Sequence, residues 1–210
     1  IWVASDYRIY VGNTNANRIL YFTQTIDVPR TFAAAVTGTT AHLSWTSVAD
    51  TRLDSFVIRR DTTGFPASAT DGVGVTSTLS SSFDDTGLAD GTYYYSIFSR
   101  DASLNYSGAA TASIMIDATG PAAPTSFLAA VNSSTVDFTW NNPGDGDFSY
   151  VTLVRKTSGF PASANDGVVV SSSIIGTSFS DQALADGTYY YGLFARDTAG
   201  NYGPGATSSA

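Results

Sequence analysis

Apolar and polar residues alternate with a period of two through most of this chain. In one tract, Tyr93, Tyr95 and Ile97 fall on one side of the alternation, and Tyr94 and Phe98 fall on the other. Successive side chains of a β-strand point to opposite faces, so this tract predicts a strand with one face in a core. Shorter tracts with the same period surround it. The pattern therefore predicts an all-β protein.

The alternating tracts occur twice, in the same order. Residues 90–95 read Asp-Gly-Thr-Tyr-Tyr-Tyr and return at 186–191. A tryptophan, Trp45 or Trp140, precedes each copy, and a Gly-Phe-Pro-Ala-Ser-Ala turn lies between. A copy of about 95 residues is long enough to bury a core of its own. We therefore predict three parts: an N-terminal strand segment (1–26) and two sandwich domains (27–117 and 118–210).

Charge and composition narrow the classes of partner. The net charge of −8 disfavours nucleic acid and anionic membranes, which both bind through clusters of cations. No apolar run approaches the ~20 residues of a membrane-spanning helix. There is no cysteine, which rules out disulfides and thiolate metal sites. One lysine, many serines and threonines and an acidic balance are typical of a secreted protein, so we expect an extracellular or cell-surface location.

The repeated residues carry a family resemblance. The tryptophan, the Gly-Phe-Pro turn, the Leu-Ala-Asp-Gly-Thr-Tyr-x-Tyr run and residues 196–202 resemble tandem fibronectin type III domains of microbial secreted and surface proteins. The resemblance implies two seven-stranded, immunoglobulin-like sandwiches with Greek-key connections. Tyr93 and Tyr189 would then bond the backbone at the turn before their strand. Because such domains are mostly non-catalytic, the resemblance also implies no enzyme and no cofactor.

The final strand of the second copy is shorter than that of the first. Ala210 matches Ile114, so nothing in the second copy corresponds to residues 115–117. Residues 18–26, in turn, occupy the position of a final strand that has no domain before it. An unfinished sheet edge leaves backbone groups unpaired, so we expect the N-terminal segment of one subunit to complete the second domain of the next. The side chains expected to be donated are Ile9, Val11, Ile19, Tyr21 and Phe22.

Head-to-tail strand donation does not close on itself, so it predicts a homopolymer: a filament, a pilus or a surface polymer. The alternative is a non-catalytic spacer or adhesion module excised from a larger secreted enzyme or surface protein. Residues 8–22 also resemble one repeat of an NHL-type β-propeller, which would make the N-terminal segment a blade remnant of such a larger protein. Both hypotheses remain open at this point.

The outward side of the repeated strand carries aromatic and arginine side chains where a solvated face would be polar. Such residues are enriched in protein interfaces, so we expect a lateral contact between subunits. An aromatic platform for glycans is a second hypothesis, and a third is that cross-strand neighbours simply cover these side chains. The stripe consists of Tyr94, Phe98 and Arg100 in the first copy and Tyr190, Phe194 and Arg196 in the second.

Catalytic and transition-metal signatures are missing from the sequence. His42 is the only histidine, so a histidine-based triad or metal site would have to be built on it alone. Neighbouring aspartates fall in turns, where aspartate is expected for backbone reasons. Asp145 and Asp147 are weak calcium candidates, because loop carboxylates can share a calcium ion. We therefore predict a structural extracellular protein without catalytic residues, cofactor or established metal.

Overall fold

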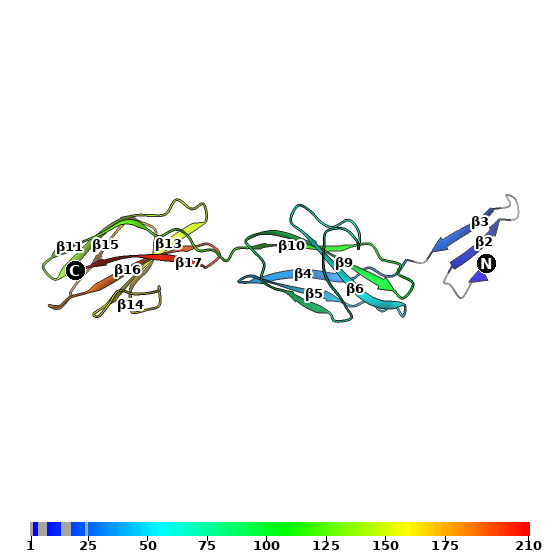
Figure 1. The fold of residues 1–210 in the computed structure, drawn as a ribbon, viewed down its shortest axis with the longest axis horizontal. Coiled ribbons are helices and arrows are strands. Elements are labelled where there is room, and N and C mark those ends of the chain that lie inside the picture. Colours follow the sequence, from blue (N-terminus) through cyan, green and yellow to red (C-terminus); the bar gives the residue numbers. More distant parts are fainter. Residues whose placement is uncertain (1, 4–7, 14–17, 24) are drawn as a thin grey trace. The chain divides into compact units, whose positions relative to one another are not determined.

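The computed structural model describes the backbone of residues 2–3, 8–13, 18–23 and 25–210, and the side chains from residue 25 onward (Figure 1). All regular secondary structure in these residues is β-strand, as the alternation predicts. The chain divides into two compact units, Ile1–Asp117 and Ala118–Ala210. Within the described residues, no helix has the length and apolarity that crossing a membrane would require.

The N-terminal segment forms a small antiparallel sheet of its own. Its strands are β1 (Trp2–Val3), β2 (Arg8–Asn13) and β3 (Arg18–Thr23), in the spatial order β1-β2-β3. β2 and β3 pair along their full length, from Arg8 opposite Thr23 to Asn13 opposite Arg18. β3 therefore has a partner strand within its own chain.

The first sandwich packs a three-stranded sheet against a four-stranded sheet. The three-stranded sheet has the order β4-β5-β8, formed by β4 (Arg30–Thr37), β5 (Thr40–Thr46) and β8 (Ser82–Asp85). The four-stranded sheet has the order β10-β9-β6-β7, formed by β6 (Leu53–Asp61), β7 (Val73–Thr78), β9 (Gly91–Asp101) and β10 (Ala110–Ile116). All pairs are antiparallel.

The second sandwich repeats this topology strand for strand. Its three-stranded sheet has the order β11-β12-β15, formed by β11 (Thr125–Asn132), β12 (Thr135–Asn141) and β15 (Ser178–Asp181). Its four-stranded sheet has the order β14-β13-β16-β17, formed by β13 (Phe148–Lys156), β14 (Val168–Ile174), β16 (Tyr190–Asp197) and β17 (Tyr202–Ser209). Each sandwich thus has seven strands with crossover connections, as the sequence predicts.

The core of each sandwich lies between its two sheets. In the first, Leu43 and Trp45 of β5 meet Phe56 and Ile58 of β6, and all four are at most 5% exposed. The rings of Trp45 and Phe56 pack edge to face with centroids 5.7 Å apart. The second core is built from the matching positions Val136, Phe138, Trp140, Val151 and Leu153. The alternation predicted one face of the long strand in the core, and Tyr93, Tyr95 and Ile97 on that face are at most 8% exposed, which confirms the prediction.

The two corner tyrosines bond as predicted. The hydroxyl of Tyr93 donates to the carbonyl of Ala89 at 3.0 Å, and that of Tyr189 donates to the carbonyl of Ala185 at 3.1 Å. Each bond ties the long strand to the turn that leads into it.

The final strands differ less than the sequence suggests. β10 pairs with β9 as far as Ile116, which lies opposite Gly91 and is 1% exposed. β17 pairs with β16, and Ala210 then exchanges two backbone hydrogen bonds with Tyr189. Within the described residues, only two ladder positions of β10 have no counterpart in the second sandwich: those of Met115 and Ile116, which pair with Thr92 and Gly91. Thr92 and Gly91 correspond to residues 188 and 187. The second sandwich is therefore paired by its own chain along most of this edge, and it lacks the last two ladder positions of the first.

Candidate contact surface on the four-stranded sheets

A loop folds over the outer face of each four-stranded sheet. It carries the Gly-Phe-Pro turn and connects β6 to β7 in the first sandwich and β13 to β14 in the second. The ring of Phe65 packs edge to face on Tyr94, with centroids 5.1 Å apart, and Phe160 packs on Tyr190 in the same way at 5.2 Å. Pro66, which follows Phe65, is buried. The outer face is therefore partly covered by the chain itself.

This cover corrects the prediction of a lateral contact through the phenylalanines. Phe98 and Phe194 are each only 3% exposed, so neither presents a surface to another molecule. In the second sandwich Phe194 forms a small separate core with Val154 and Ala164. Alternation alone placed these rings outward correctly, but it could not show that a loop would return over them.

The arginines of the stripe are also engaged within the protein. Arg100 donates to Asp54 at 2.6 Å. Arg196 donates to the hydroxyl of Tyr150 at 2.8 Å, and its guanidinium lies 5.5 Å from the ring centres of both Tyr150 and Tyr202. The other two stripe residues, Tyr94 and Tyr190, are half-buried against the loops. A lateral contact at the tyrosines and arginines stays a prediction.

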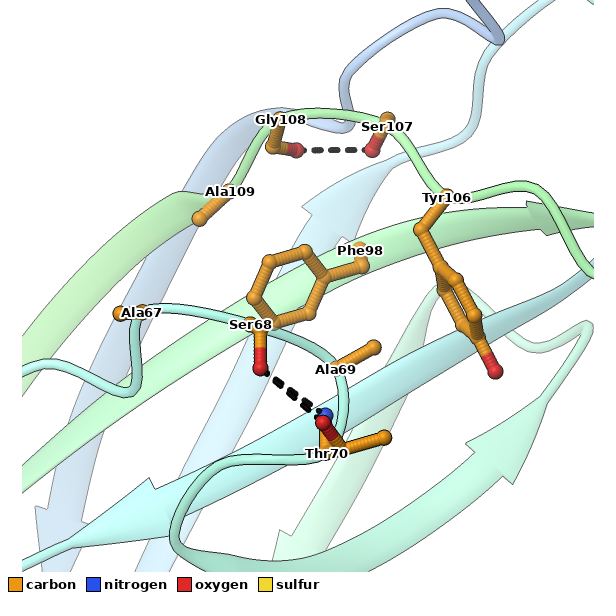
Figure 2. Close-up of a pocket in the computed structure, with 9 residues that line it drawn as sticks. All are labelled: Ala67, Ser68, Ala69, Thr70, Phe98, Tyr106, Ser107, Gly108 and Ala109. Carbon is orange, nitrogen blue, oxygen red and sulfur yellow. Dashed lines mark hydrogen bonds between the residues drawn. The ribbon is translucent and has the colours of Figure 1, made fainter.

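A cavity of about 250 Å³ opens beside Phe98 in the first sandwich (Figure 2). Phe98 and the ring of Tyr106 line it, together with residues 67–70 and 107–109. The hydroxyls of Ser68 and Thr70 bond to each other at 3.1 Å. No charged residue lines the cavity. It therefore offers little to anchor a ligand, and in particular no ionic or acid–base group.

A carboxylate fastens each covering loop. Asp71 accepts the N–H of Ala67 at 2.8 Å, and Asp166 accepts the N–H of Ala162 at the same distance. Lys156 adds its ammonium group to Asp166 at 2.9 Å. The Ala162 N–H, and then Lys156, hold the pKa of Asp166 below its usual value. These aspartates recur because the loop needs them.

The calcium candidate Asp145 has a structural partner. It accepts the N–H of Ala122 at 3.1 Å, just as Asp50 accepts the N–H of Asp27 at 3.4 Å in the first sandwich. The recurrence of this aspartate thus has a backbone explanation. One carboxylate oxygen of Asp147 lies within 4.8 Å of one from Asp197. Calcium binding at Asp145 and Asp147 stays a prediction.

Sequence reasoning missed a polar cluster that joins the two sheets of each sandwich. In the first, Arg60 donates to a carboxylate oxygen of Asp85 at 2.6 Å, and the hydroxyl of Tyr95 donates to the same oxygen at 2.8 Å. Asp85 belongs to the three-stranded sheet, whereas its two partners belong to the four-stranded sheet. We call this cluster the inter-sheet staple.

The second sandwich has the same staple. Arg155 donates to Asp181 at 2.7 Å, and Tyr191 donates to it at 2.9 Å. Burial, and then the neighbouring carboxylate, raise the pKa of both staple tyrosines. The available signal was recurrence: an arginine, an aspartate and a tyrosine stand at matching places in both copies.

The residues expected to be donated lie on the N-terminal sheet. Ile9 and Val11 are in β2, whereas Ile19, Tyr21 and Phe22 are in β3. The two strands pair with each other, and Ile9 stands opposite Phe22. The positions of their side chains lie outside the described part of the chain. Donation to another subunit is untested by these contacts.

The geometry defines the class: two seven-stranded immunoglobulin-like sandwiches in tandem. No family model matches the chain, and no curated protein matches it. Among solved structures, it is similar to the FN1–FN3 domains of chicken CNTN1, with a TM-score of 0.53 and 11% identity over 97% of this chain and 76% of that one. It is also similar to a two-domain fibronectin type III segment from chicken tenascin, with a TM-score of 0.38 and 16% identity over 87% of this chain and 98% of that one.

The first of these likenesses shows that the chain has the fold of tandem fibronectin type III domains, as the sequence resemblance implies. The TM-score of the second is too low to add to the argument. Both neighbours are chicken proteins, so the microbial form of the family stays a prediction.

Proposed function

We propose that this chain is a non-catalytic structural part of an extracellular protein, with its two sandwiches acting as a spacer or adhesion module. One observation carries the proposal. Several groups of polar residues that recur between the copies hold the chain's own structure in the same way each time. The recurring groups are the inter-sheet staple, the loop aspartates Asp71 and Asp166, and the strand-holding aspartates Asp50 and Asp145.

A recurring turn extends this observation. Asp101 accepts the backbone N–H of Asn105 and also its side-chain amide, and Asp197 does the same for Asn201. Both carboxylates are buried. Acid–base catalysis needs a carboxylate that can reach a substrate, whereas these are committed to their own loops. An extracellular location is supported by the fold and by a composition with one lysine, many serines and threonines and an acidic balance.

Head-to-tail assembly by strand donation is the second candidate, and one observation favours it. Leu184 and Tyr189 are half-buried, whereas the matching Leu88 and Tyr93 are 5% and 8% exposed. In the first sandwich, Ile116 packs in the same core cluster as Leu88 and Tyr93. A segment that prolongs β17 would cover the second pair, whether it came from the same chain or from another subunit. Within the described residues, β3 pairs with β2 on one side and is the edge strand of its sheet.

Deleting residues 1–26 separates the two candidates. Light scattering coupled to size exclusion would give the mass of the full and shortened chains, and electron micrographs would show any filaments. A spacer keeps the same mass distribution and the same unfolding transition of the second sandwich. Loss of an assembly on deletion, together with a less stable second sandwich, would overturn the spacer proposal in favour of strand donation.

A further inference from the structure

Two tripeptides from residue 25 onward read Asn-x-Ser, which is the acceptor signal for N-linked glycosylation. One occupies residues 105–107, in the turn between β9 and β10, and the other occupies residues 132–134, in the hairpin that joins β11 to β12. Both asparagines are exposed. Such a tripeptide arises easily by chance in a chain rich in serine, so the structural setting of each one decides its meaning.

The first tripeptide is engaged in the fold. The side-chain amide of Asn105 donates to the buried carboxylate of Asp101 at 2.9 Å. Ser107 is 7% exposed, and its hydroxyl donates to the carbonyl of Gly108 at 2.7 Å and accepts the N–H of Ser99 at 2.9 Å. The nitrogen that would carry a sugar is thus turned toward a buried carboxylate, and the serine hydroxyl is inaccessible.

The second sandwich shows that the fold alone accounts for Asn105. Its counterpart Asn201 donates to Asp197 at 2.8 Å in the same kind of turn. The tripeptide there is Asn-Tyr-Gly, which is not an acceptor signal. The asparagine at this position therefore recurs because the turn uses it, with or without a serine two residues later.

The second tripeptide is open. Residues 132, 133 and 134 are all exposed, and the side chains of Asn132 and Ser134 have no hydrogen-bond partner in the part of the chain that the structure describes. The fold uses only their backbone: Asn132 stands opposite Thr135, and the carbonyl of Ser134 accepts the N–H of Leu184 at 2.9 Å. Both groups of the acceptor signal, the amide nitrogen and the serine hydroxyl, are therefore accessible.

The matching hairpin of the first sandwich has no such signal. It reads Thr-Gly-Thr at residues 37–39, and the carbonyl of Thr39 accepts the N–H of Leu88 at 3.0 Å. Gly38 has a φ of 54° and Ser133 a φ of 57°, a left-handed conformation that glycine adopts more readily than serine. The fold thus requires this turn, but it requires neither the asparagine at 132 nor the serine at 133.

The strand that ends at Asn132 carries uncovered apolar residues. Leu128 is 64% exposed and Val131 is 65% exposed, whereas Val36, the counterpart of Val131, is 44% exposed. β11 is an edge strand of its sheet and has no charged residue, although charge is a usual protection of such strands. Leu128 lies four residues before Asn132, about 13 Å along the strand. A bulky hydrophilic group on Asn132 would shield this end of β11.

We propose that Asn132 is an N-glycosylation site and that its glycan shields the exposed end of β11. The proposal rests on the extracellular location proposed above, because this modification belongs to secreted proteins. The co-reactant is an oligosaccharide whose anomeric carbon is joined to a lipid pyrophosphate.

The transfer substitutes one bond of that carbon for another. Nδ2 of Asn132 bonds to the anomeric carbon while the bond from this carbon to the pyrophosphate oxygen breaks. The pyrophosphate leaves with the electron pair, and one amide proton passes to a base of the transferase. The hydroxyl of Ser134 serves as the recognition group of the acceptor signal and remains unmodified.

Peptide mass spectrometry of the protein isolated from its own source tests the site. The peptide containing Asn132 should carry a glycan, and enzymatic release should leave an aspartate at position 132, whereas the peptide containing Asn105 should be unmodified. An unmodified Asn132 peptide in protein recovered from outside the cells would refute the site and leave the extracellular location standing. Recovery of the protein solely from the cell interior would overturn both.

Variants of the full chain, secreted from cells that perform N-glycosylation, identify the acceptor. Asn132→Gln and Ser134→Ala should each lose all of the added mass. Ser133→Gly is the matched control, because it changes the same turn but keeps the acceptor signal, and it should remain glycosylated. Asn105→Gln should leave the glycan in place. A secreted parent chain of 22.0 kDa, or a glycan that only Asn105→Gln removes, would refute the site.

Shielding has a readout of its own. Enzymatic removal of the glycan should increase the fluorescence of a dye that binds apolar surface. In the double variant Leu128→Ser with Val131→Ser, removal of the glycan should leave the fluorescence unchanged. An equal increase in the parent and the double variant, or no increase in the parent, would refute the shielding of β11.

Discussion

Replacing Tyr95 with phenylalanine removes one hydroxyl group from the inter-sheet staple and almost nothing else. Tyr95 is fully buried, and its hydroxyl donates to Asp85 at 2.8 Å. A hydrogen bond to a charged group contributes about 1.5–3 kcal/mol to stability. Asp85 retains Arg60 at 2.6 Å in the variant, so the carboxylate is not left unpaired. We therefore expect the first sandwich to lose about 1–2 kcal/mol.

The loss should be confined to the first sandwich. Within a domain of this size, about 1–2 kcal/mol corresponds to a fall of roughly 4–16 °C in melting temperature. Calorimetry would measure the transition, and hydrogen exchange of peptides from each sandwich would show which one has been destabilised. Tyr191→Phe is the matched variant in the second sandwich and should produce the complementary result. Tyr94→Phe, on the opposite side of the same strand, should change stability by less than about 0.5 kcal/mol.

The result that would refute this reasoning is a Tyr95→Phe variant as stable as the parent. Buried ionic groups lose hydration on folding, and that loss can cancel the gain from their contacts. In that case the staple would fix the alignment of the two sheets without stabilising them. A Tyr94→Phe variant destabilised as much as Tyr95→Phe would refute it differently, because a hydroxyl outside the staple would then contribute as much as the one that bonds Asp85.

Three further predictions follow from the same contacts. Trp45 Nε1 is buried without a partner among the described residues, whereas Nε1 of Trp140 in the second sandwich donates to Asn142 at 2.8 Å. Ser47 occupies the position of Asn142 in the first copy, so Ser47→Asn should stabilise the first sandwich by about 1 kcal/mol. Urea unfolding followed by fluorescence would measure the gain. The hydrogen bond from Arg52 lowers the pKa of Asp50 to about 2. The contribution of the Asp50 carboxylate to stability is therefore present above about pH 4 and is lost as pH falls toward 2. Asp50→Asn should flatten that part of the stability–pH curve. The pKa of both staple tyrosines is raised, so their contribution to folding stability is present below about pH 10 and is lost above it. Unfolding midpoints should therefore fall above pH 10, and they should fall less in the double variant Tyr95→Phe with Tyr191→Phe.

The sequence predicts the fold best where the period-two pattern of a single strand and the repeat of the whole domain agree. Alternation placed Tyr93, Tyr95 and Ile97 on the core face of the long strand, and all three are buried. Corner tyrosines could be named because the family pattern marks them, and Tyr93 bonds as expected. Period-two patterns report which side of a strand a residue occupies. They do not report what lies on that side, and therefore the burial of Phe98 beneath a loop could not be read from them.

The candidate site was harder to predict because its parts are distant in the sequence. The staple brings Arg60, Asp85 and Tyr95 together from three strands, and no local pattern marks such a meeting. Asp85 was interpreted as a turn residue, which is the usual place for aspartate. The final strand illustrates a second limit. Matching Ala210 to Ile114 showed how far the repeat extends, but not that β17 would begin earlier than β10 and pair over eight residues.

The two copies serve as controls for each other, and this separates requirements of the fold from features that need another explanation. Residues with the same contacts in both sandwiches are accounted for by the fold. Differences are not: β14 carries a bulge with Ser173 in a left-handed conformation, whereas β7 pairs regularly at the same place. A fold that tolerates this bulge in one sandwich does not require it in the other. Specific binding by this protein should therefore be sought where the copies differ.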